Sequence, residues 1–246
     1  MRDLNDVETE LILSDLVMVE KRLERLEKDR KKIKSAELDH EFELLEKARV
    51  VLEDNRPLRA IELDAESEKR LRGFGFLSQK PMLHVLNLGE QDAPRLHEIE
   101  QEFRRRHLAG HPRTEVTAIC GKIEAELAEL DPADAEEYMA TYGLPESGLR
   151  RLIHAGYCLL GLISFLTCGD AEVRAWTIPA GTTALKAAGT VHTDFEKKFI
   201  RAEVANWKTL VQAGGYAGAR EKGLLRLEGK EYVVQDGDIL NIRYNL

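Results

Sequence analysis

The feature that most constrains the fold is an alternation of apolar and polar side chains over residues 240–246. The apolar set is Leu240, Ile242, Tyr244 and Leu246, and the polar set is Asn241, Arg243 and Asn245. Successive side chains of a β-strand point to opposite faces of a sheet, so this pattern predicts a strand with one buried and one solvated face. The chain is therefore expected to form a β-sheet that packs against a hydrophobic core on one face and is exposed to solvent on the other.

The segment before this strand predicts partners for it. Ile200, Ala202 and Val204 form a second alternating run, residues 225–228 form a third, and Tyr232 to Val234 predicts a return strand after a turn. The remaining elements predicted here are a helix over 207–213, ended by Gly214 and Gly215, and a turn over 235–238 in which Gly237 adopts a positive φ. The pattern predicts a small mixed sheet wrapped around one helix.

The N-terminal region predicts two helices. Spacings of four and three relate Ile12, Leu16, Val19, Leu23, Leu26, Arg30 and Ile33, and again Leu38, Phe42, Leu45, Arg49 and Leu52. Only Arg30 and Arg49 interrupt the two apolar sets. With a reversal over 34–38, this indicates an antiparallel helical hairpin. We favour a projecting coiled coil because the opposite faces are highly charged. The alternative is a helical pair packed on a globular body.

The central region changes to the pattern of a parallel sheet. An apolar run over 82–86 predicts a strand, Asp92 and Pro94 suit the N-cap and first turn of a helix, and residues 115–120 predict a second strand that leads into a helix over 121–130. Strand, helix, strand and helix in this order are typical of a βαβ unit. Further helices are expected after Asp131 and after Pro145.

Composition limits the functional classes. The 246 residues carry a net charge of −8, so the chain is not a polybasic nucleic-acid binder, and the region from Cys168 onward is close to neutral. Three widely spaced cysteines indicate neither a disulfide framework nor a metal site, and the longest apolar run is about half a membrane span. We expect a cytoplasmic protein.

The sequence contains no phosphate loop of the form G-x-x-x-x-G-K-[ST]. The turn His192-Thr193-Asp194 has no nucleophile in an identifiable arrangement, and such polar residues usually bond local backbone groups. We assign no catalytic residue and no metal ligand.

A second turn of interest is Asn87-Leu88-Gly89-Glu90, which ends the first central strand. Taken alone, N-x-x-E is a common strand-ending turn in which Gly89 serves the backbone and Glu90 faces solvent.

The motifs resemble a known family. The blocks K-A-A-G-T-V-H-T-D-F-E-K-K-F-I-R-A-E-V-A-N-W and L-E-G-K-E-Y-V-V-Q-D-G-D-I-L-N-I-R-Y-N-L closely resemble the TGS domain of the YchF subfamily of Obg-like ATPases, and N-L-G-E and I-C-G-K-I-E-A-E-L resemble its nucleotide-binding domain. The resemblance implies an α+β chain in three parts. These are a coiled-coil hairpin over 1–66, the C-terminal part of a G-type domain over 67–162, and a ubiquitin-like β-grasp TGS domain over 163–246.

The resemblance also implies a base site. Asn87 would hydrogen-bond the adenine edge, Leu88 would pack near the base, and Glu90 would replace the Asp that reads guanine. Cys120 and Gly121, together with Lys122, would form the neighbouring base-side loop. The implied cofactor is ATP, with GTP left open, and Mg²⁺ only together with the family's N-terminal portion, which carries the phosphate loop, the switch regions and the metal ligands.

Two functions remain open. The first is a truncated YchF-like ATPase that acts with ribosomes in translation or stress and lacks hydrolysis by itself, since the phosphate loop is absent. The second is a stand-alone module that binds RNA or the ribosome without nucleotide, through the hairpin and the TGS domain. In either case we expect a monomer with no membrane or DNA partner. Because two parallel strands cannot close a nucleotide domain, we also expect exposed apolar surface and an open sheet edge in the central part.

Overall fold

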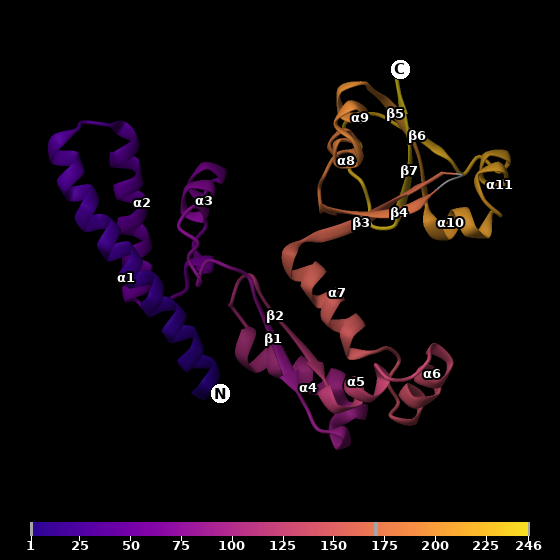
Figure 1. Cartoon of the computed structure of the whole chain (residues 1–246), viewed down its shortest axis with the longest axis horizontal. Helices are drawn as coiled ribbons and strands as arrows, with labels where there is room; N and C mark the ends of the chain where they lie inside the picture. The colour runs from indigo at the N-terminus through magenta and orange to yellow at the C-terminus, as the bar shows by residue number, and fades with distance from the viewer. Residues whose placement is uncertain (1, 170–171, 246) are drawn as a thin grey trace. The chain divides into compact units, whose positions relative to one another are not determined.

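The computed structural model describes residues 2–169 and 172–245, which fall into two compact units, Met1–Ala155 and Gly156–Leu246 (Figure 1). Leu246, which the alternating pattern includes, lies outside the described residues. No described helix is both long enough and apolar enough to span a bilayer.

The N-terminal unit begins with the predicted helical hairpin, α1 (Arg2–Lys32) and α2 (Ala36–Glu53). Its seam is fully or nearly buried at Ile12, Val19, Leu23, Leu26, Leu44, Leu45, Ala48 and Leu52. The prediction of a reversal over 34–38 is wrong in its second half, because α2 already begins at Ala36. Ile33 lies beyond the end of α1, and its side chain is 61% exposed rather than part of the seam.

The base of the hairpin is joined to the residues that follow it, η1 (Leu58–Ala60) and α3 (Ala65–Arg72). Its apolar seam continues into Leu58, Leu71 and Phe76. The buried carboxylate of Asp15 accepts hydrogen bonds from Ser78 N–H at 2.7 Å and from the Ser78 hydroxyl at 2.6 Å. A carboxylate on α1 thus satisfies backbone and hydroxyl donors of a distant loop, which ties the two segments together.

The central elements form the predicted βαβ unit. In chain order they are β1 (Met82–Asn87), η2 (Glu90–Arg95), α4 (Leu96–Phe103), η3 (Arg104–Leu108), β2 (Thr114–Ile119) and α5 (Gly121–Leu127). β1 and β2 pair in parallel, and Asn87 lies opposite Ile119. The expected N-cap at Asp92 is wrong, because the chain first makes the 3₁₀ turn η2, which contains Pro94, and Arg95 precedes α4. Two helices complete the unit, α6 (Pro132–Thr141), which Asp131 caps, and α7 (Gly148–Leu160), whose last residues belong to the C-terminal unit.

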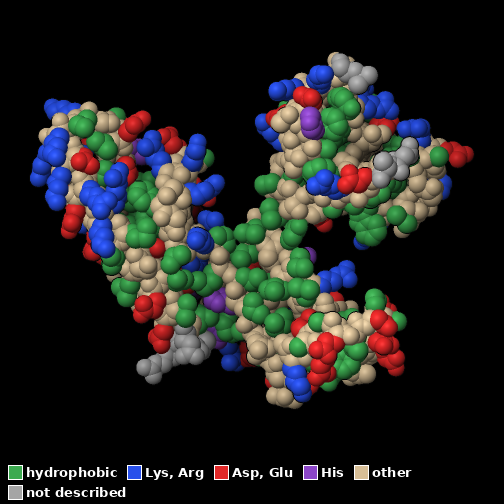
Figure 2. All heavy atoms as spheres, viewed as in Figure 1, with side chains coloured by type: hydrophobic (Ala, Val, Ile, Leu, Met, Phe, Trp, Pro, Cys, Tyr) green, Lys and Arg blue, Asp and Glu red, His purple; other side chains and the backbone are tan. Residues whose placement is uncertain are grey.

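The central part exposes apolar surface, as expected. On α7, Leu149 is 61% and Ile153 is 53% exposed, one helical turn apart, and Val85 of β1 is 43% exposed. Figure 2 shows hydrophobic side chains gathered at the surface over α7. Among the described strands none pairs with β1 or β2 except each other, so both outer edges of this sheet are open.

The C-terminal unit is a five-stranded mixed sheet. Its elements are β3 (Leu162–Cys168), β4 (Val173–Pro179), α8 (Ala184–Val191), α9 (Thr193–Lys197), β5 (Phe199–Asn206), α10 (Trp207–Gln212), α11 (Tyr216–Glu221), β6 (Arg226–Glu228) and β7 (Asp238–Tyr244). The strand order is β4-β3-β7-β5-β6, in which β3 and β7 are parallel and the other pairs antiparallel.

One core lies between this sheet and α8. Ala187 and Ala188 of the helix form a single buried cluster with Phe165, Val204 and Leu240 of the strands. Small residues on the helix let it approach the sheet closely. On the other face, Leu210 of α10 and Ala219 of α11 cluster with Ile239.

The predicted strand is confirmed over 240–244, where Leu240 is buried and Asn241 and Arg243 are exposed, but Tyr244 is 39% exposed and not part of the buried face. The positive φ of Gly237 (76°) is also confirmed. The return strand at Tyr232 to Val234 is wrong, because this segment makes only a single bridge, from Val233 to Thr183. The inward position of Ile200 is also wrong. A bulge between Phe199 and Arg201 leaves Ile200 44% exposed.

Candidate functional site

The candidate site lies at the carboxyl edge of the parallel pair β1 and β2. Asn87 is the last residue of β1, and the N–H of Leu88 donates to Ile119 O at 2.9 Å, which extends the pairing by one residue. Because the carboxyl ends of parallel strands meet at one edge, the turn after β1 lies beside the turn after β2. The sequence therefore brings Asn87 next to the start of α5.

Asn87 is bonded to that second turn. Gly121 N–H donates to Asn87 Oδ1 at 2.9 Å. A Cβ at position 121 would lie 3.0 Å from the same oxygen, so glycine is what permits this short approach. Asn87 is exposed, and within the described residues its Nδ2 group donates no hydrogen bond, so this donor is available to a ligand.

Glu90 is held by Lys122, the third residue of the loop that the resemblance places beside the base. The Lys122 ammonium lies 3.1 Å from both carboxylate oxygens of Glu90. The hydrogen bond to Glu90 raises the pKa of Lys122 above its ordinary value. The lysine follows directly after Gly121, so the resemblance placed it in the loop, but its pairing with Glu90 was not predicted.

The side chain of Cys120 is buried and does not reach the surface of the sheet edge. It is 2% exposed and packs in a small core with Ala93 and Ile123. Both the thiol and the backbone of Cys120 are therefore closed to a ligand at this edge. Asn87 is exposed, and Leu88, Glu90 and Gly121 are half-buried. Four of the five predicted site residues are therefore accessible at this edge, and Cys120 is the exception.

Glu124 also organises this region, and the sequence analysis missed it. Its two carboxylate oxygens accept hydrogen bonds from Gly148 N–H at 2.6 Å and Leu149 N–H at 3.1 Å. These N–H groups begin α7 and have no partner within the helix, so a carboxylate there stabilises the helix start. Glu124 thereby fixes α7 to the helix that carries Gly121.

The His192 turn has the local role that the sequence predicted. His192 Nδ1 accepts from Asp194 N–H at 3.2 Å and caps α9. No group of three or more metal-ligating side chains occurs in the part of the chain that the structure describes.

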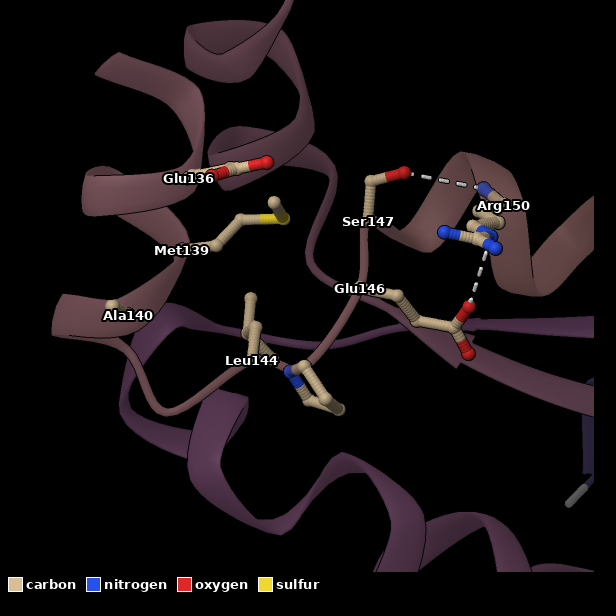
Figure 3. A pocket seen from close by; sticks show the side chains of 8 residues that line it. Glu136, Met139, Ala140, Leu144, Glu146, Ser147 and Arg150 are labelled. Carbon is tan, nitrogen blue, oxygen red and sulfur yellow. Dashed lines mark hydrogen bonds and ion pairs between the residues drawn. The ribbon is translucent and has the colours of Figure 1, made fainter. Parts of the chain in front are cut away.

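A pocket of about 390 Å³ is lined by residues of α6, α7 and the loop between them (Figure 3). Ser147 and Arg150 lie on one side and Met139 and Leu144 on the other, and Arg150 pairs with Glu146 at 3.6 Å. The lining includes none of the five predicted site residues, and it has no pair of groups arranged as nucleophile and base.

The fold and this edge can be compared with known proteins. A family model described as "YchF-GTPase_C: Protein of unknown function (DUF933)" matches residues 162–245. The "Ribosome-binding ATPase YchF" of Bacillus subtilis is 42% identical over 244 residues, which is 99% of this chain and 66% of that protein. The chain belongs to the YchF family. The resemblance inferred from the motifs is thereby confirmed, and the chain corresponds to a C-terminal portion of YchF proteins.

Other YchF relatives agree. The "Obg-like ATPase 1" of Oryza sativa subsp. japonica is 34% identical over 254 residues, covering 100% of this chain and 62% of that protein. The structure titled "Structure of the Schizosaccharomyces pombe YchF GTPase" matches with a TM-score of 0.78 and 31% identity over 98% of this chain and 65% of that chain. A GTP-binding protein from Pyrococcus horikoshii OT3 matches at 21% identity with a TM-score of 0.57 over 99% of this chain and 71% of that chain, which supports the fold alone. The chain thus spans about two-thirds of the length of its YchF relatives.

Proposed function

We propose that the chain is the base-recognising and partner-binding portion of a ribosome-associated YchF ATPase. The observation that carries the proposal is the hydrogen bond from Gly121 N–H to Asn87 Oδ1, which joins the N-L-G-E turn to the C-G-K turn at one sheet edge. The names of the relatives, ribosome-binding ATPase and Obg-like ATPase, supply the partner and the nucleotide.

In this proposal Asn87 binds the adenine edge through its free Nδ2 donor, and Leu88 packs beside the base. The backbone of Gly121 bounds the other side, and the buried Cys120 supports this turn from the core. Guanine recognition needs a carboxylate free to accept from the N1–H and N2–H groups, and the Glu90 carboxylate is engaged by Lys122. The site therefore favours ATP over GTP.

The triphosphate and Mg²⁺ do not fit the residues of this chain. Its sequence lacks the glycine-rich loop with Lys and Ser or Thr that cradles phosphates, and the described residues hold no cluster of metal-ligating side chains. We derive no hydrolytic step from them, and we propose that the chain does not hydrolyse ATP by itself.

We assign the coiled-coil hairpin to 1–66, the partial G-type domain to 67–162 and the TGS domain to 163–246. The order β4-β3-β7-β5-β6, with parallel strands β3 and β7 in its centre, supports the β-grasp assignment. The buried seam of α1 and α2 supports the coiled coil. We place the protein in the cytoplasm as a monomer.

Binding of adenine nucleotide to the chain tests the base site. By isothermal titration we expect ATP to bind more tightly than GTP and Asn87→Ala to weaken ATP by about tenfold, the upper end for loss of one neutral hydrogen bond. Gln101→Ala, an exposed amide on α4, is the matched control. Equal affinity of the Asn87→Ala and parent chains would contradict the site, and phosphate release that Asn87→Ala abolishes would contradict the absence of hydrolysis.

The second candidate is a nucleotide-independent ribosome- or RNA-binding module. It is favoured by the separate buried cores of the hairpin and of the C-terminal sheet, neither of which includes the base site. Co-sedimentation with ribosomes separates the two candidates. ATP-dependent sedimentation supports the first, and sedimentation that is the same with and without ATP supports the second.

A further inference from the structure

The pocket between α6 and α7 has an apolar floor and a charged border. Met139 of α6 and Leu144 of the loop that follows point into it, and both side chains are half-buried (Figure 3). Its volume of about 390 Å³ falls within the range of about 300–1,000 Å³ that is typical of ligand-binding pockets. The pocket is therefore large enough to accept one long side chain of a partner.

Hydrogen bonds around the pocket hold its walls in place. On one side, Glu124 accepts hydrogen bonds from Gly148 N–H at 2.6 Å and Leu149 N–H at 3.1 Å, at the start of α7. On the other side, Tyr138 of α6 packs against the small core under α5 and donates a hydrogen bond to Glu126. The walls are thus fixed before a ligand arrives, which lowers the ordering cost of binding.

The charged groups of the pocket favour a cationic ligand. The N–H groups that begin a helix can attract an anion, but those of α7 are already bonded to Glu124 and to the Ser147 hydroxyl. The guanidinium group of Arg150 pairs with Glu146 at 3.6 Å. Glu136, which also lines the pocket, is exposed and has no ion pair with any described residue. The unbalanced charge at the pocket is therefore negative.

The surroundings of the pocket are acidic over a wider area. Eight acidic residues and no lysine or arginine occur between Lys122 and Arg150, so this segment carries the net charge of −8 and the rest of the chain is balanced. Figure 2 shows acidic side chains gathered at the surface over α6. The exposed carboxylates of the segment that have no ion pair with any described residue are Glu129, Asp134, Glu136 and Glu137. Such a field attracts and orients a partner with several positive charges.

We propose that this pocket and the acidic surface around it bind a lysine- or arginine-rich segment of another protein, independently of the nucleotide site proposed at the sheet edge. Lysine and arginine lay their apolar stems along apolar surface while the charged group stays near water. One such side chain places its stem on Met139 and Leu144 and its charge beside Glu136, and methionine adapts to stems of different shape. A small cation is a poorer fit, because it balances one carboxylate and leaves the others unpaired.

The test measures fluorescence anisotropy of a labelled oligo-arginine peptide with the full chain at 50 and 200 mM KCl. Glu136→Gln removes one charge at the pocket at nearly constant size. We expect it to weaken binding about tenfold at 50 mM KCl, the loss of one hydrogen bond to a charged group, and less at 200 mM KCl, because salt screens exposed charges. Glu43→Gln makes the same change at an exposed position on α2 and should keep the parental affinity.

A second variant tests the apolar floor. Met139→Gln replaces the thioether by an amide of similar length and leaves the net charge unchanged. We expect it to weaken binding severalfold and by the same factor at both salt concentrations, because salt does not screen an apolar contact. Far-ultraviolet circular dichroism identical to that of the parent chain shows that the variant is folded.

Equal affinity of the Glu136→Gln and parent chains, or an equal loss in Glu43→Gln, would overturn the proposal. So would a parent chain that binds spermidine but not the peptide, because the ligand is then a small polyamine. Self-association of the parent chain in sedimentation velocity that Glu136→Gln abolishes would assign the pocket to a second copy of this chain, and the proposed partner would be wrong.

Discussion

At the scale of single residues, the fold concentrates its polar interactions on a few carboxylates. Asp15, Glu124, Glu203 and Asp238 each accept hydrogen bonds from groups on other elements or turns. Such contacts are costly to break, because a buried donor loses its partner when the carboxylate is removed. Asp15 thereby holds the loop at Ser78 to α1, and Glu124 holds the start of α7 to α5.

The contact between Tyr232 and Asp238 is expected to make the stability of the fold depend on pH. Burial and the hydrogen bond that its hydroxyl donates to Asp238 (2.7 Å) raise the pKa of Tyr232 to about 12. The folded state therefore holds the phenolic proton more tightly than the unfolded chain, whose tyrosines titrate near 10. This stabilisation is complete below about pH 10 and is lost as the pH rises towards 12.

We expect the free energy of unfolding, followed by tryptophan fluorescence in urea, to fall less steeply between pH 10 and 12 in Tyr232→Phe than in the parent chain. Tyr157→Phe removes a phenol that bonds Thr177 at 2.8 Å instead of a carboxylate, and it serves as the control. Identical pH profiles for Tyr232→Phe and the parent chain would contradict the assignment.

The candidate site at the edge of β1 and β2 was predictable at the residue scale only in part. Asn87 and Gly121 could be placed together, because the ends of neighbouring parallel strands share an edge. The burial of the Cys120 thiol and the pairing of Glu90 with Lys122 depend on the path of the chain after each strand. Sequence periodicity carries no information about that path.

At the scale of elements, periodic segments were predictable and local departures from periodicity were not. The hairpin and the β1–β2 pair follow from apolar spacing, which the burial of one face enforces. The bulge at Ile200 shifts one strand by a residue without any signal in the pattern. Tyr232 and Val234 alternate with exposed Val233 because they pack under the sheet and not because they pair as a strand.

The close packing of α10 on α11 gives a prediction for this scale. A Cβ at Gly218 would lie 2.0 Å from the backbone oxygen of Ala213, so Gly218→Ala has to displace main chain. We expect Gly218→Ala to lower the stability of the C-terminal unit by about 1–3 kcal/mol, as overpacking does. Tryptophan fluorescence in urea reports it, since Trp176 and Trp207 both belong to this unit.

Gly156→Ala is the matched control. Gly156 lies within α7 and an added Cβ meets nothing within 4 Å, so alanine is expected to stabilise the helix by up to about 1 kcal/mol. A Gly218→Ala chain as stable as the parent would show that the two helices separate easily.

At the scale of the whole molecule, each unit has its own buried cores, yet the N-terminal unit leaves apolar surface in contact with solvent. Leu149 and Ile153 are four residues apart in the sequence, which places them on one face of the helix expected after Pro145. What covers Leu149 and Ile153 depends on contacts that a pattern within one helix does not encode. The exposed Leu149 and Ile153 of α7 and the open edges of β1 and β2 all lie in the N-terminal unit. Its central part therefore has both apolar side chains and strand edges that no other described element covers.

This surface should bind a hydrophobic dye. We expect the chain to enhance anilinonaphthalene sulfonate fluorescence, and we expect the double variant Leu149→Gln, Ile153→Gln to reduce the enhancement at unchanged far-ultraviolet circular dichroism. Val50→Gln, a 53% exposed position on α2, is the control and should leave the enhancement as it is. A parent chain that does not bind the dye would contradict the exposure.

The order β4-β3-β7-β5-β6 has a consequence for synthesis. β7 is made after the other four strands, yet it lies between β3 and β5 and supplies the pairing of both. Until residues 238–244 have left the exit tunnel, no strand hydrogen-bonds the β4-β3 pair to the β5-β6 pair. Maturation of this unit is therefore a late, all-or-none event that a nascent-chain stall upstream of Asp238 should block.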